Sequence, residues 1–386
     1  MQITSRGRLF FFLHNAFIIV LLCFLVGCGS SVRKPSNSLE LIDSQTAANF
    51  SVNTAWSVSL GEINYFTHIQ PRNGLIAVST STNDIVVLDE QGQAVWRASI
   101  NAPVIAGVGF DGQRAAVVTA KNELLVLDKG KILWSKPLRG RVSTAPLVSG
   151  ERVFILGLDR AVEAYDALDG RYLWRFHRPG EPLVLQFPGV LSPHKNTLLL
   201  GSGSKLLGLN SLTGSVQWEL NIGIPKGLDE IERLAELVGP IARPSSNLFC
   251  VRAYQLAVGC VDADKSSLLW SRNITGAEPV AATSQLMVAT DNVDKVVALN
   301  SKNGQNLWTN ESLIRGGLSA PIIWGSFVVM GDNEGIIHFL NLTHGKTILR
   351  YPAAKSPIHS VPVIFGKNLL VTSSNGSLIA LRISEK

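Results

Sequence analysis

Short apolar runs separated by polar turns fill the chain from about residue 54 to the C-terminus. One example is the pair of runs at 152–156 and 161–165, which flank a turn at 157–160 and follow another apolar segment at 145–148. Runs of this length bounded by Gly, Asp and Asn are typical of β-strands joined in antiparallel hairpins. The pattern therefore predicts an all-β protein built from many short strands.

A tryptophan ends each group of strands at a nearly constant interval. The intervals run from 38 to 44 residues, with one of 52, and Leu349 continues the series. The tryptophans of the series are Trp56, Trp96, Trp134, Trp174, Trp218, Trp270 and Trp308. Trp174, Trp218 and Trp308 follow the pattern Asp/Asn-x-x-x-Gly-x-x-x-Trp, and Leu349 ends a fourth copy. Shorter forms precede Trp96 and Trp134, and Ser266 replaces the glycine before Trp270. Asp or Asn opens a tight turn, and Gly takes the positive φ that the turn requires.

Four short strands in a repeat of about 40 residues are the signature of a β-propeller blade. Because no blade buries its faces alone, neighbouring blades must stack and the ring must close. Seven repeats are complete, and an eighth at 360–383 has three strands and then stops. The strand around Trp56 precedes the first complete blade and supplies the missing fourth strand. We therefore predict an eight-bladed β-propeller closed by strands from both termini, with the tryptophans packed between blades. Seven blades would leave Trp56 or the last repeat without a place.

The first residues have the pattern of a bacterial lipoprotein leader. Arg6 and Arg8 precede an apolar run at 9–27, which ends in Leu25-Val-Gly-Cys28. This ending resembles the lipobox, in which the cysteine is acylated and the chain is cut before it. We predict a signal peptide at 1–27, lipidation of Cys28, a flexible Ser/Asn-rich tether at 28–53 and the propeller at 54–386. The alternative is an uncleaved N-terminal membrane anchor.

Charge and cysteine content narrow the possible ligands. The formal net charge is +6, yet both signs are scattered and no Lys/Arg block interleaves with aromatic residues, so we expect no nucleic acid ligand. No Cys/His spacing matches a metal site. Cys250 and Cys260 lie outside the leader and flank a stretch that reads as a hairpin. They form either a disulfide, which the periplasm permits, or a pair of buried thiols.

The repeat of 52 residues contains an insertion at 228–238. Ile231, Leu234, Leu237 and Val238 recur at helical spacing among acidic residues, which predicts a short amphipathic helix on a loop. Such a helix either packs on its own blade or meets a partner.

The tryptophan repeat resembles that of quinoprotein dehydrogenases and their non-enzymatic relatives. Together with the lipobox, the chain resembles the BamB family, the propeller lipoproteins of the outer-membrane barrel assembly machinery. Three segments carry the closer resemblance: 328–341, with Gly-Asp-x-Glu-Gly and a following His338; Glu230-Ile-Glu-Arg-Leu234; and Leu318-Ser-Ala-Pro321.

The resemblance implies a docking role for two neighbouring loops. The family binds the periplasmic domains of BamA, the barrel insertase, through a Leu-x-Leu-Arg segment and an acidic segment. The first corresponds to Leu183-Val-Leu185-Gln186, in which Gln replaces Arg. The second lies near Glu236-Leu-Val238 and retains one acid of two. We expect both loops on one face of the ring, with Glu230, Glu232 and Glu236 as its acidic part.

The resemblance also implies a place and a set of partners. The protein is expected at the outer membrane, lipid-anchored and facing the periplasm. Its expected partners are BamA and other assembly components, and unfolded outer-membrane proteins are a further candidate ligand. A quinone-dependent dehydrogenase is the alternative enzyme, but it needs a longer chain, an adjacent-cysteine disulfide and Ca²⁺ held by Glu, Asn and Asp beside a catalytic Asp. We therefore expect no cofactor and no catalysis. A propeller that binds another envelope component is the third hypothesis.

Overall fold

A computed structural model describes residues 50–62, 69–179 and 183–385 of the chain. They belong to one compact unit, 39–386. The predicted signal peptide at 1–27, Cys28 and most of the predicted tether lie outside the described residues. Within the described residues there is no α-helix, and hence no helix long and apolar enough to cross a membrane.

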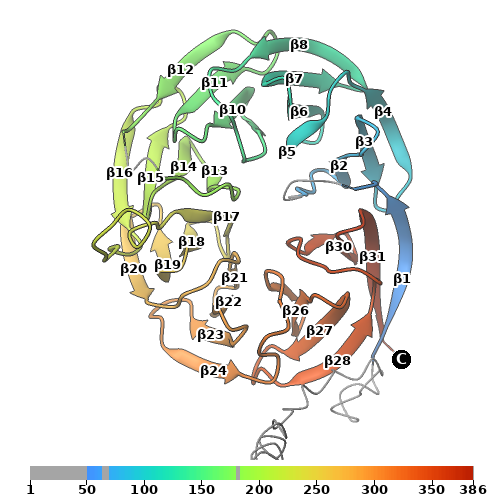
Figure 1. The fold of residues 1–386 in the computed structure, drawn as a ribbon, viewed down its shortest axis with the longest axis vertical. Coiled ribbons are helices and arrows are strands. Elements are labelled where there is room, and N and C mark those ends of the chain that lie inside the picture. Colours follow the sequence, from blue (N-terminus) through green and yellow to red (C-terminus); the bar gives the residue numbers. More distant parts are fainter. Residues whose placement is uncertain (1–49, 63–68, 180–182, 386) are drawn as a thin grey trace, which may run out of the picture. The chain divides into compact units, whose positions relative to one another are not determined.

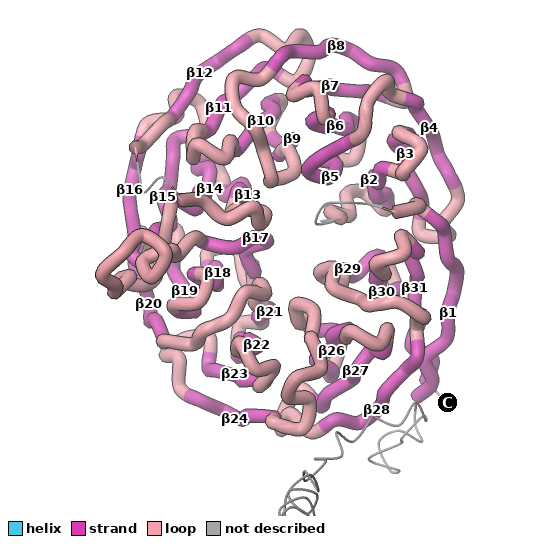
Figure 2. Tube along the Cα trace, viewed as in Figure 1, coloured by secondary structure: helices cyan, strands magenta, loops and turns pink. Residues whose placement is uncertain are grey.

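Eight antiparallel sheets follow one another around a ring, which confirms the predicted eight-bladed propeller (Figures 1 and 2). Seven sheets have four strands, and the sheet β2–β4 has three among the described residues.

The first blade comprises β2 (Leu75–Ser79), β3 (Asp84–Asp89) and β4 (Ala94–Ser99), and the second comprises β5 (Val104–Phe110), β6 (Arg114–Thr119), β7 (Glu123–Asp128) and β8 (Lys131–Pro137). The third comprises β9 (Leu147–Ser149), β10 (Arg152–Leu156), β11 (Val162–Asp166) and β12 (Tyr172–Phe176). The fourth comprises β13 (Leu191–His194), β14 (Thr197–Ser202), β15 (Lys205–Asn210) and β16 (Val216–Asn221). The other four comprise β17 (Leu237–Ala242), β18 (Leu248–Ala253), β19 (Ala257–Asp262), β20 (Ser267–Arg272); β21 (Ala281–Ala282), β22 (Leu286–Thr290), β23 (Val296–Asn300), β24 (Asn306–Asn310); β25 (Ile322–Trp324), β26 (Phe327–Gly331), β27 (Ile336–Asn341), β28 (Thr347–Pro352); and β29 (Val363–Phe365), β30 (Asn368–Thr372), β31 (Ser377–Glu385) with β1 (Phe50–Ser59).

The ring closes through β1, which pairs with β31 from Phe50 opposite Glu385 to Ser59 opposite Ser377. This confirms the closure by both termini. The predicted start of the propeller at residue 54 is wrong, because β1 begins at Phe50. Phe50 is buried, with its ring centroid 4.7 Å from that of Phe327. A buried aromatic residue therefore precedes the Trp56 segment within the same strand.

Each boundary between blades holds its own hydrophobic cluster. The described core divides into eight clusters, and each combines residues of two neighbouring sheets. Across the closure, for example, Ile76 of the first blade shares a cluster with Leu370 of the last. Because the apolar surface of every blade is buried against both neighbours, the stability of one blade depends on the complete ring.

The repeated tryptophan and glycine form one contact across these boundaries. Trp134 Nε1 donates a hydrogen bond to Ala167 O of the next blade (3.0 Å), and its ring covers Gly170, whose φ is 70°. A Cβ atom at Gly170 would lie 2.7 Å from that ring. The same arrangement joins Trp56 to Gly92, Trp174 to Gly214, Trp270 to Gly304 and Trp308 to Gly345. Glycine is thus required both for the conformation of the turn and for the close approach of the indole ring. These contacts agree with the interpretation of the tryptophans as packing residues.

Two exceptions to the repeat have a geometric explanation. Ser266 stands where Trp218 would need a glycine, and Trp218 lies instead over Gly208 of its own blade. Leu349 precedes the last blade, whose third and fourth strands come from opposite termini and are therefore not joined by a turn. An indole at position 349 would have no turn glycine to cover.

Cys250 and Cys260 form a disulfide between directly opposed residues of β18 and β19, which decides between the two alternatives left by the sequence. Both cysteines are fully buried, in the cluster that joins the blades β17–β20 and β21–β24.

The closure generates a test. Deletion of residues 29–47 should leave the melting temperature unchanged, because β1 stays whole. Deletion of residues 29–59 should lower it sharply, and Phe50→Ala alone should cost about 3 kcal/mol, because a buried aromatic ring is lost. Thermal melts of the purified variants provide the measurement. Equal melting temperatures for the two deletions would contradict closure by β1.

Candidate functional site

Three segments on one side of the ring form the candidate site. The hairpin turn 157–160 joins β10 to β11, the connection 177–190 joins β12 to β13, and the connection 222–236 joins β16 to β17. Turns between second and third strands lie at the same strand ends as connections between blades, because all strands in a blade are antiparallel. The sequence prediction that 183–186 and the following insertion share one face agrees with this topology.

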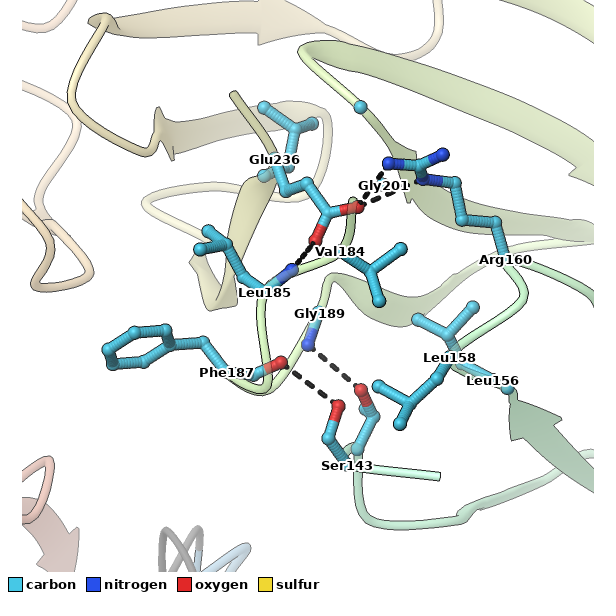
Figure 3. A pocket seen from close by; sticks show the side chains of 14 residues that line it. Ser143, Leu156, Leu158, Arg160, Val184, Leu185, Phe187, Gly189, Gly201 and Glu236 are labelled. Atoms are coloured by element: carbon cyan, nitrogen blue, oxygen red, sulfur yellow. Dashed lines mark hydrogen bonds and ion pairs between the residues drawn. The ribbon is translucent and has the colours of Figure 1, made fainter. Parts of the chain in front are cut away.

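Glu236 links all three segments (Figure 3). Its carboxylate accepts a hydrogen bond from Arg160 Nε (2.9 Å) and another from the backbone N–H of Leu185 (2.9 Å). Arg160 also donates from Nη2 to Leu183 O (2.9 Å). Only 17% of the Glu236 side chain is exposed, so the carboxylate that the sequence predicts as a partner-binding group is engaged mostly within the protein.

A second set of contacts holds the base of the connection. Ser143 Oγ donates to Phe187 O (3.1 Å), and Gly189 N–H donates to Thr144 Oγ1 (2.8 Å). Between these contacts and the Glu236 contacts lies a small pocket of about 40 Å³, which Leu156 and Leu158 help to line. The loop 183–186 is therefore fixed at both ends. Leu183 (39% exposed) and Gln186 lie at the surface, while Leu185 is half-buried.

The insertion at 228–238 is not a helix, and this prediction was wrong. Asp229 accepts the N–H groups of Ile231 and Glu232 on Oδ1, so a side chain instead of a helical backbone satisfies them. Glu232 in turn accepts the N–H of Leu228. The segment forms turns until β17 begins at Leu237, and Figure 2 shows it as a coil beside β16 and β20.

The tip of the connection 222–236 carries large apolar side chains that its own blade does not cover. Ile224 is 74% exposed, Leu228 97% and Ile231 74%. Glu230 and Glu232 are also exposed. A turn held by its own hydrogen bonds thus presents aliphatic and acidic groups to solvent, which is the composition of an interaction surface.

Among the described residues, the innermost strands of seven blades and residues 69–72 ahead of the first blade line a channel of about 490 Å³. Its lining is mostly proline, small and aliphatic residues, with Arg72 and Arg243 as the charged members. Among the described residues, no three His, Cys, Asp or Glu side chains gather in a way that could hold a metal ion.

The histidine of the segment 328–341 has a structural partner. His338 Nε2 lies 2.7 Å from Asp332 Oδ2, and Asp332 Oδ1 accepts the N–H groups of Glu334 and Ile336. Both His338 and Asp332 are buried. The Gly-Asp-x-Glu-Gly turn and its histidine therefore shape the hairpin between β26 and β27.

A buried arginine at the end of β18 holds the connection 273–280 and the end of β22. Arg252 is fully buried and donates to three backbone carbonyls, Ile274 O (3.0 Å), Glu278 O (2.6 Å) and Thr290 O (2.5 Å), and burial lowers its pKa to about 10. Burial raises the pKa of the Glu278 carboxyl to about 7, although the nearby Arg252 charge and the N–H of Ala320 partly oppose this. Glu278 also lines a recess with Phe187 of the candidate connection.

The sequence places the 183–186 loop and Glu236 in the predicted contact, but it gives no sign of Arg160, Ser143 and Thr144, which hold this loop in the structure. Arg160 is separated from Glu236 by 76 residues, and its turn resembles the turns of other blades. Only the rotation from blade to blade brings the two residues together. A charged residue at the left-handed position of that turn (φ 62°) is a weak signal by itself.

Comparison with known proteins gives one consistent result. The family model described as "Outer membrane protein assembly factor BamB" matches residues 81–310 and 294–386. The protein of that name from Bordetella pertussis is 32% identical over 376 residues, which span 96% of this chain and 97% of the relative. That from Burkholderia pseudomallei is 29% identical, over 86% of this chain and 88% of the relative.

Solved structures share the fold at low sequence identity. The crystal structure of BamB from Moraxella catarrhalis matches with a TM-score of 0.77 and 19% identity, covering 86% of this chain and all of that chain. A quinohemoprotein alcohol dehydrogenase from Comamonas testosteroni matches with a TM-score of 0.64 and 12% identity, covering 86% and 76%.

The raised pKa of Glu278 predicts a pH-dependent stability. The carboxyl holds its proton more tightly in the folded state than its ordinary value of 4.5, so the folded state loses stability as the pH rises from about 4.5 through 7. Glu278→Gln removes this loss. The variant should gain about 2 kcal/mol over the parent at pH 8 compared with pH 5, measured by urea unfolding at both values. Glu334→Gln, which changes an exposed carboxylate, is the control. A Glu278→Gln effect that is equal at both pH values would contradict the assignment.

Proposed function

Because the chain belongs to the family of the outer membrane protein assembly factor BamB, we propose that it is a scaffold of the outer-membrane β-barrel assembly machinery. It assists the folding and insertion of outer-membrane proteins by docking the insertase. The observation that carries the proposal is the match to the family over nearly the whole chain, together with a rigid ring that holds an apolar and acidic loop surface on one side.

The partner in this proposal is the set of periplasmic domains of BamA, bound through the 183–186 loop and the neighbouring insertion. Leu183 and Leu185 form the apolar part, and Glu230 and Glu232 the acidic rim. An interface of this kind draws most of its affinity from a few anchored side chains surrounded by polar groups. Gln186 stands where the family has Arg, so this chain contributes one charge fewer to the contact.

The residues that line the channel favour a scaffold function rather than that of a quinone-dependent dehydrogenase. The dehydrogenase chemistry needs carboxylate and amide ligands for Ca²⁺ next to a catalytic Asp, whereas the described channel lining offers Arg72 and Arg243 among apolar residues. Saturable binding of pyrroloquinoline quinone with Ca²⁺ at micromolar concentration would favour the enzyme instead.

The proposed location is the periplasmic side of the outer membrane, with residues 1–27 removed and Cys28 lipidated. Acyl chains anchor firmly because each buried methylene contributes about 0.8 kcal/mol. Further proposed partners are other assembly components and unfolded outer-membrane proteins, which the propeller would contact while the tether links it to the membrane.

Loss of the apolar anchors should weaken the insertase complex. Leu183→Ala combined with Leu185→Ala should raise the Kd for the BamA periplasmic domains at least ~tenfold, without lowering the melting temperature, because the truncated side chains face the partner. Surface plasmon resonance on folded protein provides the measurement. The matched control is Leu168→Ala with Leu212→Ala, two leucines that are 60% and 57% exposed at the opposite strand ends. Unchanged affinity for the first pair would remove this face from the proposal.

The anchor has its own test. Mass spectrometry of the protein purified from membranes should find an acylated N-terminus at Cys28. Cys28→Ser should release the protein from the membrane fraction, because no acyl chain can be attached. An intact leader or an unlipidated start would refute the lipoprotein assignment.

A further inference from the structure

We infer that Arg160 and Glu236 form a positioning clamp, which holds the 183–186 loop in its binding shape before a partner arrives. The inference rests on the proposed function of that loop and assigns Glu236 a role other than direct contact. Neither residue is then a partner-binding group. Both act through the backbone of Leu183 and Leu185.

The loop depends on side chains for its shape. Residues 183–187 belong to no β-strand, so their backbone groups have no ladder of hydrogen bonds to order them. The N–H of Leu185 donates to Glu236, and the C=O of Leu183 accepts from Arg160. The two bonds lie on alternate residues of the loop, and the Arg160–Glu236 ion pair (2.9 Å) joins their partners. Backbone on both sides of Val184 is therefore fixed by one pair of side chains.

The clamp is also sheltered from water. The Arg160 and Glu236 side chains are 12% and 17% exposed. Charge-assisted hydrogen bonds in such surroundings are stronger and less screened by salt than exposed ion pairs. A guanidinium can meet a carboxylate and a carbonyl at the same time because its donors are arranged in a planar fork, whereas an ammonium group is a single point donor.

The clamp spans three parts of the ring. Arg160 comes from a turn within the blade β9–β12, Glu236 from the connection that leads into β17, and the loop from the connection between them. Ring closure fixes these blades relative to one another, so it also fixes the loop. Binding then avoids much of the entropy cost of ordering a loop, which is the advantage of a preorganised site.

Hydrogen exchange at the Leu185 amide tests the clamp without any partner. Arg160→Gln and Glu236→Gln should each speed this exchange ~tenfold or more, because the amide loses its held acceptor. The double variant should match either single one, since the two side chains act as a unit. Arg97→Gln is the matched control: it removes an ion pair of similar length, 3.1 Å, to Asp84 in the first blade, and should leave the exchange unchanged.

Affinity for the BamA periplasmic domains provides the second readout. Both single variants should weaken binding about tenfold at an unchanged melting temperature, and the loss should persist at high salt. Arg160→Lys should weaken binding less than Arg160→Gln does, because lysine retains the positive charge but lacks the planar set of donors of a guanidinium. Unchanged exchange of the Leu185 amide in these variants would overturn the clamp. So would a Glu236→Gln variant that has normal exchange but a lower, salt-sensitive association rate, because that result indicates direct contact between Glu236 and the partner. If the parent protein fails to bind BamA, the proposed function fails, while the exchange data still decide whether the clamp exists.

Discussion

The structure depends on the contact between an indole of one blade and a turn glycine of the next. The turn needs a positive φ and the indole needs a surface without a Cβ atom, so a single glycine meets both demands. Each contact joins two blades that share a buried apolar cluster. No blade has a core of its own. The contacts between blades therefore stabilise the fold fully only when β1 closes the ring by pairing with β31.

The same constraint produces the candidate site. Arg160, Leu185 and Glu236 come from three different segments, and they meet because successive blades are held at a fixed rotation. A single bridge between Gly189 and Val238 also joins the loop connection to the start of β17. The ring therefore supplies rigid positions, and the loops supply chemistry: the exposed Leu183 beside the half-buried Leu185, and aliphatic and acidic groups at the tip of the connection 222–236. A scaffold needs a fixed surface of this kind more than it needs a reactive centre.

Regular repetition explains what the sequence could predict. The tryptophan interval, the turn glycines and the unpaired strand at each end lead to eight blades and a closure by both termini, as observed. Features set by single contacts were harder to predict. Phe50 lies in a polar stretch whose strand pairing is visible only in the fold, and Asp229 turns a helical pattern into a capped turn. The clamp joins residues far apart in the chain, which no local pattern records.

In the proposed function, the 183–186 side of the ring docks the barrel insertase. Site-specific photo-crosslinking in living cells tests this, from a photoreactive residue at position 183 and, for comparison, from position 168 at the opposite strand ends. We expect an adduct with the insertase from position 183 and none from position 168. Equal adducts from both positions, or no insertase adduct from position 183, would contradict it.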